Sequence, residues 1–193
     1  MKAMGSRIPG FRGEYLWELD IPQTQLLALA DAFPEEKYDW RPADDARSFS
    51  EVLVHVAAGN LMLLRLVGVQ APGGLDLYGS LEGDQFTRLA AAIRNNISLE
   101  KTVTEKRAVI DLLRRSFEAV RQSLMASGDE EIEISGHFFS EPTTVRRVYL
   151  RMLAHSHEHM GQAIAYARAS GIKVPWPDPL KEFKRMTADA RSN

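Results

Sequence analysis

Cysteine is absent from the 193 residues of this sequence. Disulfide bonds, thiolate nucleophiles and cysteine metal ligands are therefore all excluded, and a metal site would have to use histidine, aspartate or glutamate. A chain without cysteine also suits the cytoplasm, where thiols stay reduced. Residues 1–12 lack the apolar segment of a secretory signal. We therefore expect a cytoplasmic protein.

A strong net charge is also missing. The sequence holds 24 basic and 26 acidic side chains, for a formal charge of −2, so no global field attracts nucleic acid or an anionic membrane surface. No apolar run reaches the roughly 20 residues that a membrane-spanning helix needs. We expect no nucleic-acid partner and no membrane partner.

The residues that are present suit a globular protein. Apolar residues make up 45% of the chain and charged residues 26%, and 193 residues are enough to enclose a full hydrophobic core. There is no internal repeat and no change of composition that would mark a domain boundary. The sequence therefore predicts a single domain over residues 1–193, with its core at about 13–172.

Helical periodicity dominates the chain. Apolar residues recur at steps of three and four in four long segments, which is the pattern of helices that bury one face. Since no convincing sheet accompanies them, the predicted fold class is all-α, a four-helix bundle. The long connection after the second segment allows neighbouring helices to be parallel. The four segments span about residues 13–32, 48–67, 102–127 and 143–171.

Local signals place several helix boundaries. Ser48 and Glu51 have the spacing of a capping box, which predicts a helix start at Ser48. Thr102 and Glu105 have the same spacing and suggest a second capping box at the start of the third long segment. Pro22 falls inside the first segment, where it either opens a new helix or kinks a continuous one.

Smaller pieces complete the predicted fold. Residues 84–95 should form a short extra helix, and residues 131–134 alternate as a short strand would. The proline-rich residues 174–179 cannot form a regular helix, and they should pack as an extended C-terminal cover over the bundle. A last amphipathic piece should follow at 180–186.

The last long segment contains a cluster of three histidines. His155 and His159 are four residues apart and share one helix face, about 6 Å apart along the axis, whereas His157 points nearly the opposite way. The shared face also carries Met152 and Ala163 at core-facing spacing. A buried imidazole needs a hydrogen-bond partner or a metal ion. Spacing alone leaves two interpretations open: two satisfied core histidines, or part of a metal site.

Two further histidines are less informative. His55 lies on the apolar face of the second long segment, and a lone histidine there is more often a core or surface residue than a metal ligand. His137 lies next to two phenylalanines in a predicted loop. Its loop position is compatible with the mouth of a site, but an ordinary loop histidine is the favoured interpretation.

Three blocks of sequence resemble one known family. They are Tyr38-Asp39-Trp40-Arg41-Pro42, the run from Phe49 to His55, and His155-Ser156-His157-Glu158-His159-Met160-Gly161-Gln162. Together they are similar to the DinB/YfiT-like metalloenzyme superfamily of four-helix bundles, over about residues 15–172. The resemblance implies an up-down-down-up order of the helices. It also implies a metal held by one histidine of the second helix and two of the last, here His55, His155 and His159.

The resemblance implies an activity as well. Three neutral imidazoles leave coordination positions open and suit Zn²⁺ or Ni²⁺. Relatives include thiol-dependent S-transferases, so we expect a metal-dependent S-transferase that uses an external low-molecular-weight thiol and a small-molecule substrate. Two alternatives remain: a metal-dependent hydrolase using a metal-bound hydroxide, and a non-catalytic bundle that binds a metal or a ligand. Family members often dimerise, so a homodimer is expected.

The catalytic residues are not evident from the sequence. Gln162, one turn beyond His159, is a candidate for orienting a ligand or a bound water, and Glu158 is a candidate because it adjoins a predicted ligand. Substrate specificity would come from the loops at 70–84 and 129–142. A polar or basic pocket at the metal would favour the transferase, and a carboxylate near the metal would favour the hydrolase. A fourth protein ligand would favour the non-catalytic interpretation.

Overall fold

The computed structural model of the chain describes residues 8–68, 75, 77–78, 82–138, 141–177 and 183. Nearly all of the regular structure is helical, which confirms the all-α prediction. The elements are α1 (Phe11–Ala32), the 3₁₀ turn η2 (Glu35–Lys37), α2 (Phe49–Leu66), α3 (Gln85–Thr102), α4 (Lys106–Ala126), α5 (Asp129–Ile132), β1 (Ser135–Phe138), β2 (Glu141–Thr144) and α6 (Val145–Ala169).

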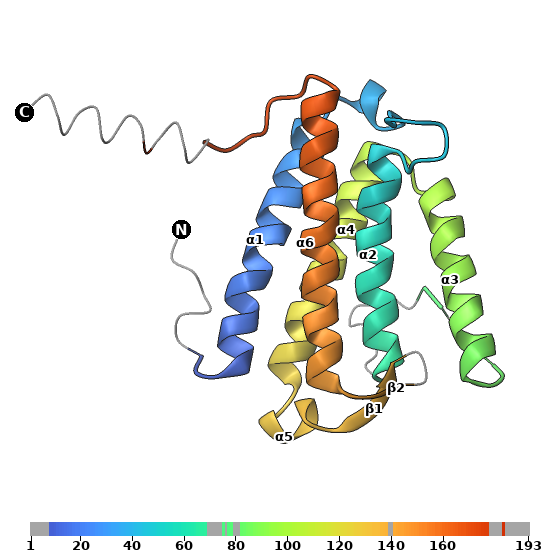
Figure 1. The fold of residues 1–193 in the computed structure, drawn as a ribbon, viewed down its shortest axis with the longest axis vertical. Helices are drawn as coiled ribbons and strands as arrows, with labels where there is room; N and C mark the ends of the chain where they lie inside the picture. The colour runs from blue at the N-terminus through green and yellow to red at the C-terminus, as the bar shows by residue number, and fades with distance from the viewer. Residues whose placement is uncertain are drawn as a thin grey trace, which may run out of the picture.

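Helices α1, α2, α4 and α6 form a four-helix bundle (Figure 1). In the ring that they make, α1 packs on α4 and α6, and α2 packs on the same two helices. Helices α1 and α6 run in one direction while α2 and α4 run in the other, which is the up-down-down-up order that the family resemblance implied (Figure 1). The long connection from α2 to α4 contains α3, and this makes the parallel arrangement of α2 and α4 possible.

Helix α2 is the central helix of the molecule. It contacts α3, α4 and α6, and most of its side chains are buried. Its length and apolar composition are those of a membrane-spanning helix, but 78% of the relevant window is buried inside the protein. The core helix of a globular bundle has the same properties, because burial on all sides removes the need for a polar face.

The start of α2 is fixed by several interactions, and these set the position of His55 two turns later. The capping box predicted from the sequence is present: the Glu51 N–H donates to the Ser48 hydroxyl, and the Ser48 N–H donates to the Glu51 carboxylate. Phe49 stacks on Phe33 with ring centroids 3.4 Å apart. Such a cap stabilises a helix end by about 1 kcal/mol.

The structure decides one open local prediction and shows that two others were wrong. Of the two alternatives for Pro22, the continuous helix is present, since Pro22 lies inside α1 and does not open a new helix. The extra helix α3 extends to Thr102, well beyond the predicted end at residue 95. Thr102 therefore ends α3, and the Glu105 carboxylate caps α4 by accepting from the N–H groups of Arg107 and Ala108. Sequence spacing cannot distinguish a Thr-x-x-Glu capping box from a glutamate that caps the helix itself.

The region before α6 also differs from the prediction. Residues 131–134, predicted to be a strand, contain the end of the short helix α5 and a turn. The extended segments are β1 and β2, which pair as an antiparallel hairpin just before α6. The prediction of a strand was wrong because the acidic residues favour a helical turn here. The Gly128 N–H donates to the carboxylate of Glu131 and so caps the start of α5.

The C-terminal cover is present as far as the described residues extend. Ile172, Val174 and Trp176 follow α6 without helical structure and pack, partly buried, against the core. The predicted amphipathic piece at 180–186 lies outside the described residues except for Phe183, which is exposed. The loop expected at 70–84 is also described only in part.

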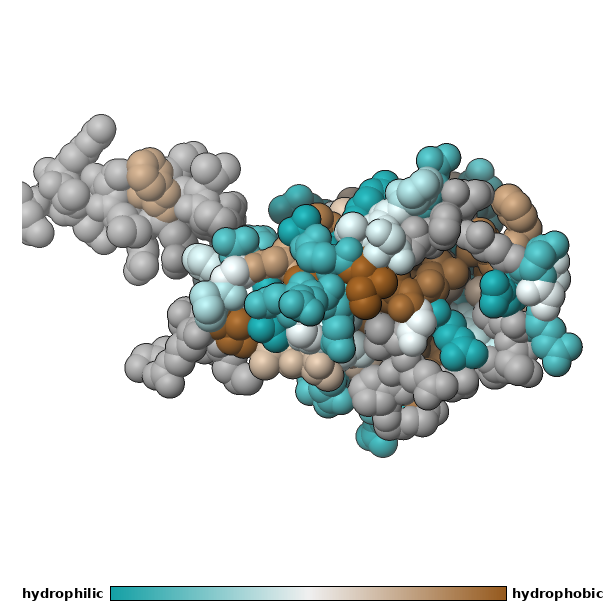
Figure 2. Space-filling model, turned by 90° about the horizontal axis from the view of Figure 1, so that it is seen from below, coloured by the Kyte–Doolittle hydropathy of each residue, from teal (hydrophilic) through white to brown (hydrophobic). Residues whose placement is uncertain are grey.

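One end of the bundle carries an apolar area. On the face seen in Figure 2, where α1 and α6 begin, apolar residues lie near the centre.

Candidate metal centre

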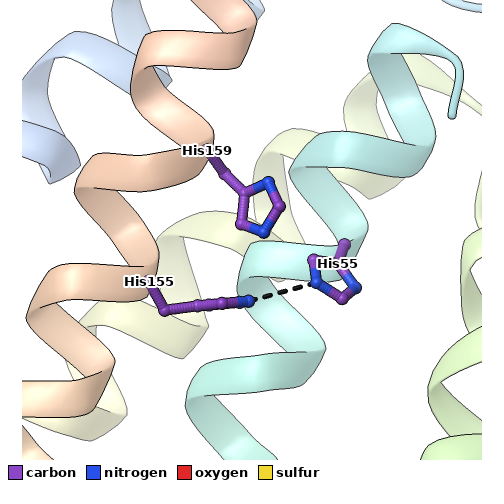
Figure 3. A group of neighbouring side chains, drawn as sticks. All are labelled: His55, His155 and His159. Carbon is purple, nitrogen blue, oxygen red and sulfur yellow. Dashed lines mark hydrogen bonds between the residues drawn. The ribbon is translucent and has the colours of Figure 1, made fainter. Parts of the chain in front are cut away.

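Three imidazole rings meet inside the bundle between α2 and α6 (Figure 3). His55 comes from α2, and His155 and His159 come from successive turns of α6. The three ring centroids lie 4.6 to 4.9 Å apart, and each ring offers a nitrogen within 4.8 Å of the other two. The structure thus brings together the two histidines paired by spacing and the third one assigned by family resemblance.

The His155 ring fits between the helices because residue 59 has no side chain. A Cβ atom at Gly59 would lie 2.6 Å from Cε1 and 3.1 Å from Nδ1 of His155. Real Cβ atoms do not approach other atoms so closely. Gly59 therefore gives the imidazole its place against the α2 backbone, which explains a glycine in the interior of a helix where it costs roughly 0.5–1 kcal/mol.

Hydrogen bonds set the orientation of the other two rings. His55 Nδ1 lies 2.7 Å from Oε1 of Glu100, and His159 Nδ1 lies 2.8 Å from Oε1 of Gln162. The Gln162 amide is oriented in turn, because its Nε2 donates to the Tyr166 hydroxyl at 2.9 Å. Both acceptors are oxygens, so Nδ1 of each of these rings is the donor and Nε2 faces the cluster, where Nε2 of His55 shares a hydrogen bond with Nε2 of His155.

The two rings of α6 have the protonation state that a metal ion needs. Burial, and then the charges of His159, His55 and nearby arginines, lower the pKa of His155 to about 3. Burial also lowers the pKa of His159, although its hydrogen bond with Gln162 opposes this effect. His155 and His159 are therefore neutral near pH 7, and neutral imidazole is the form that ligates metals.

The distances fit a shared divalent ion. Nε2 of His155 lies 3.1 Å from Nε2 of His55. Two imidazole nitrogens bound to one tetrahedral zinc ion with bonds of about 2.0–2.1 Å lie roughly 3.3 Å apart. Among the described residues, the group that could hold a metal consists of these three histidines, without a fourth protein ligand. The donor set therefore suits a metal that retains open coordination positions.

A layer of ion pairs surrounds the rings on the side of α3. The buried carboxylate of Glu100 accepts from His55 with one oxygen and from Nε of Arg47, at 2.7 Å, with the other. Burial by itself raises the pKa of Glu100, but the hydrogen bonds and charges of His55 and Arg47 outweigh it and hold the pKa below its usual value. Glu100 is therefore ionised, and it links the surface cation Arg47 to the metal centre.

An open cleft of about 520 Å³ adjoins this layer. It lies between the loop before α2, the end of α3 and α6, and two of its lining residues bond directly to site histidines: Glu100 to His55, and Gln162 to His159. The cleft thus offers space for a small molecule, separated from the rings by Glu100 and Gln162. Its lining is Arg41, Asp44, Asp45, Ala46, Arg47, Glu51, Ile97, Glu100, Lys101 and Gln162.

Comparisons with known proteins identify the family of this chain and a solved structure with a similar fold. The model of the DinB superfamily matches residues 18–163, which is most of the chain and includes all three histidines. The chain belongs to the DinB superfamily. No curated protein matches it. Among solved structures, it is similar to a DinB-like protein from Bacillus cereus ATCC 10987, with a TM-score of 0.65, 17% identity, and coverage of 87% of this chain and 97% of that one. At this identity the likeness shows a shared fold.

The remaining sequence candidates lie in different surroundings in this DinB-superfamily chain. Gln162 contacts His159 and lines the cleft. Glu158 has an exposed carboxylate that pairs with Arg151 at 3.3 Å, so it faces solvent. His157 is not part of the cluster. His137 lies in β1, at the end of the bundle where α6 begins, about 15 Å along α6 from the turn of His155. The hairpin region predicted to line the site therefore lies at a distance from it.

Sequence reasoning missed Glu100 and Arg47. The extra helix was predicted to end at residue 95, which left Glu100 outside any helix. With α3 extended to Thr102, Glu100 falls on the same face as Ala92 and Asn96, and all three are buried against the bundle. A carboxylate at helical spacing on a buried stripe is the signal that would have identified Glu100 as the partner of a buried polar group.

Proposed function

We propose that this DinB-superfamily protein is a metal-dependent enzyme, and that it transfers an external low-molecular-weight thiol to a small-molecule substrate. His55, His155 and His159 would hold a divalent ion, with Zn²⁺ and Ni²⁺ best suited to the imidazole donors. The observation that carries the proposal is the convergence of three imidazole rings, two of which have Nδ1 occupied by Glu100 and Gln162.

Two features support an enzyme over a structural metal site. Structural zinc sites are closed by four protein ligands, whereas the described residues supply three. The cleft of about 520 Å³ is separated from the rings only by Glu100 and Gln162, so a small molecule has room close to the centre. A metal bound there would supply a Lewis acid that favours the ionised form of a nucleophile such as a thiol.

Thiol transfer is supported over hydrolysis by the carboxylates of the site. A hydrolase needs a free general base within hydrogen-bonding reach of the reacting water. Glu100 is occupied by His55 and Arg47, and Glu51 by the capping box and two cations. In the transfer reaction, the thiol sulfur forms a bond to an electrophilic carbon of the substrate. The leaving group takes the bonding pair, and the thiol proton is released. The chain has no cysteine, so the thiol comes from solution.

Metal analysis of the purified protein tests the first part of the proposal. The wild type should carry one equivalent of metal after loading with Zn²⁺ or Ni²⁺ and desalting. His55→Ala should lose it, because two ligands remain on one helix. His157→Ala is the matched control, since it removes a histidine from the same helix as two of the ligands but outside the cluster. Equal metal content in the wild type and His55→Ala would overturn the metal site.

Activity assays on the metal-loaded protein test the second part. Incubation with electrophilic small molecules should consume them only when a low-molecular-weight thiol is added, and the product should contain sulfur by mass spectrometry. Turnover without thiol would instead indicate the hydrolase. Stoichiometric metal with no turnover under either condition would favour the non-catalytic, ligand-binding interpretation.

We also propose that the protein forms a homodimer in the cytoplasm. Large apolar side chains are exposed on two helices: Trp17 and Ile21 on α1, and Phe86 and Ile93 on α3. Apolar side chains on the outer faces of a bundle favour burial against a second copy. Light scattering after size-exclusion chromatography tests this, and a mass of 21.7 kDa would contradict it.

A further inference from the structure

Arg47 occupies a distinctive position between the metal centre and the solvent. It immediately precedes Ser48, the N-cap of α2, and its side chain is 38% exposed. Its Nε atom donates to Glu100 at 2.7 Å, and Glu100 in turn accepts from Nδ1 of His55. The guanidinium is thereby anchored at one nitrogen by a buried carboxylate, which fixes its orientation in the wall of the cleft.

The outer edge of this guanidinium is unused. Nε is occupied by Glu100, whereas Nη1 and Nη2 of Arg47 form no hydrogen bond to any of the described residues. The neighbouring arginine of the cleft differs in this respect. Arg41 donates from Nη1 to the Ala46 carbonyl oxygen and from both terminal nitrogens to Glu51. Arg47 therefore presents two free donors to the cleft, and Arg41 does not.

We propose that Arg47 is a binding residue for a carboxylate of the molecule that reacts at the metal centre, held by its terminal guanidinium nitrogens. This inference rests on the proposed function for the identity of the reacting site. Two parallel N–H groups match the two oxygens of a carboxylate, and such bidentate pairs combine strength with fixed geometry. The anchor to Glu100 then places the bound carboxylate at a set position relative to His55.

The charges around the cleft make this contact selective. Arg41 and Lys101 both pair with the buried Glu51, and Arg47 pairs with Glu100. Asp44 and Asp45, the remaining acidic lining residues, are exposed and repel anions at the rim. A carboxylate can thus gain a bidentate contact at the free edge of Arg47, whereas the ammonium of Lys101, which pairs with Glu51, offers single donors. Small carboxylates that can place one carboxylate on Arg47 are therefore favoured over large polyanions.

Titration of succinate into the protein tests the contact without any activity assay. The protein is first treated with a chelator, so that the carboxylate cannot bind a metal instead. Succinate should bind to the wild type, and Arg47→Gln should weaken this binding by about 10- to 100-fold, the usual effect of losing a charge-assisted bidentate pair. Succinamide, the neutral isostere, should not bind. Equal succinate affinity in the wild type and Arg47→Gln would overturn the proposal.

Two further variants separate binding from structural support. Arg47→Lys keeps a cation beside Glu100 but lacks the fork, so metal content should be retained while succinate affinity falls. Arg41→Lys is the matched control, because both terminal nitrogens of Arg41 already have partners. This variant should bind succinate as the wild type does. Parallel loss of metal and succinate in Arg47→Lys, or a loss in Arg41→Lys as large as in Arg47→Gln, would overturn the proposal.

The carboxylate can belong to the thiol or to the substrate, and competition on the zinc-loaded protein distinguishes them. If succinate displaces mercaptosuccinate but not 2-mercaptoethanol, the Arg47 position receives the carboxylate of the thiol. If succinate and mercaptosuccinate bind together, it receives that of the substrate. Failure of the proposed function and failure of the Arg47 proposal can also be distinguished. Absence of metal binding by the wild type would contradict the proposed function. The succinate titration uses metal-free protein and therefore tests Arg47 independently.

Discussion

The imidazole of His155 packs directly on the backbone of α2 at Gly59, where a Cβ atom would come within 2.6 Å of the ring. This contact sets how closely α2 and α6 approach at the level of the three histidines. It also explains why a ring from α6 reaches to 3.1 Å from the ring of His55 on α2. The spacing of the two helices, and not only the identity of the ligands, therefore determines the geometry of the centre.

Gly59→Ala should disturb the metal centre. The new methyl group pushes the His155 ring away from His55, which should lower metal affinity by about 10- to 100-fold, as for other changes that misorient a ligand. Overpacking should also destabilise the fold by about 1–3 kcal/mol, partly offset by the better helix propensity of alanine. Metal titration and urea unfolding measure the two effects.

Gly161→Ala is the matched control for this substitution. Gly161 also lies inside a helix near the site, but a Cβ atom there would meet nothing within 4 Å. We expect unchanged metal affinity and a gain in stability of up to about 1 kcal/mol. If both alanine variants bound metal equally well, the contact between His155 and residue 59 would have no role in the site.

Glu100→Gln should weaken metal binding although Glu100 is not a ligand. The amide removes the negative charge that holds His55 Nδ1–H and the guanidinium of Arg47, so the ring of His55 loses its fixed orientation and some basicity. We expect a decrease in metal affinity of about 10- to 100-fold, measured by competition with a chromogenic chelator. Glu158→Gln, an exposed change on α6, should leave metal affinity intact.

Metal binding should stabilise the fold. At a free metal concentration about 1,000 times the Kd, the gain is roughly 4 kcal/mol, which corresponds to a rise in Tm on the order of 10 °C for a chain of this size. Calorimetry of chelator-treated and zinc-loaded protein measures the shift. His55→Ala should show almost none of it, and a full shift in that variant would place the stabilising metal elsewhere.

Stability should also depend on pH through Glu51. Burial by itself raises the pKa of this carboxyl, but hydrogen bonds from Lys101, the Ser48 N–H and Arg41 outweigh it, so the folded pKa lies below its usual value. The resulting stabilisation is fully present above the unfolded pKa of about 4.3 and is lost as the pH falls through the folded pKa. Glu51→Gln keeps the cap but removes the charge.

Urea unfolding of the wild type and Glu51→Gln at two pH values checks this dependence. At pH 7 the variant should be less stable by about 1–2 kcal/mol, the usual loss for hydrogen bonds to a charged group. Near pH 3 the difference should shrink, because the wild-type carboxyl is also becoming protonated. A difference that stayed constant with pH would mean that Glu51 acts through shape alone.

The sequence determined most of the fold, and two of the three histidines of the candidate centre, by local rules. Apolar periodicity located the long helices, the spacing of Ser48 and Glu51 located the start of α2, and the four-residue step put His155 and His159 on one buried face. These features depend on neighbours within one or two turns. They can therefore be predicted from one sequence, because helix geometry relates residues at these spacings directly. That the three histidines bind metal stays a prediction.

Only the tertiary structure decided which distant residues complete the centre. His55 meets His155 across 100 residues of sequence, and Glu100 meets His55 across 45. These contacts depend on the extent of α3, on the packing of α3 against α2 and on the contact between His155 and Gly59. The contacts between helices leave no local pattern, because the free energy that selects them comes from packing between helices and not from the propensities of one segment.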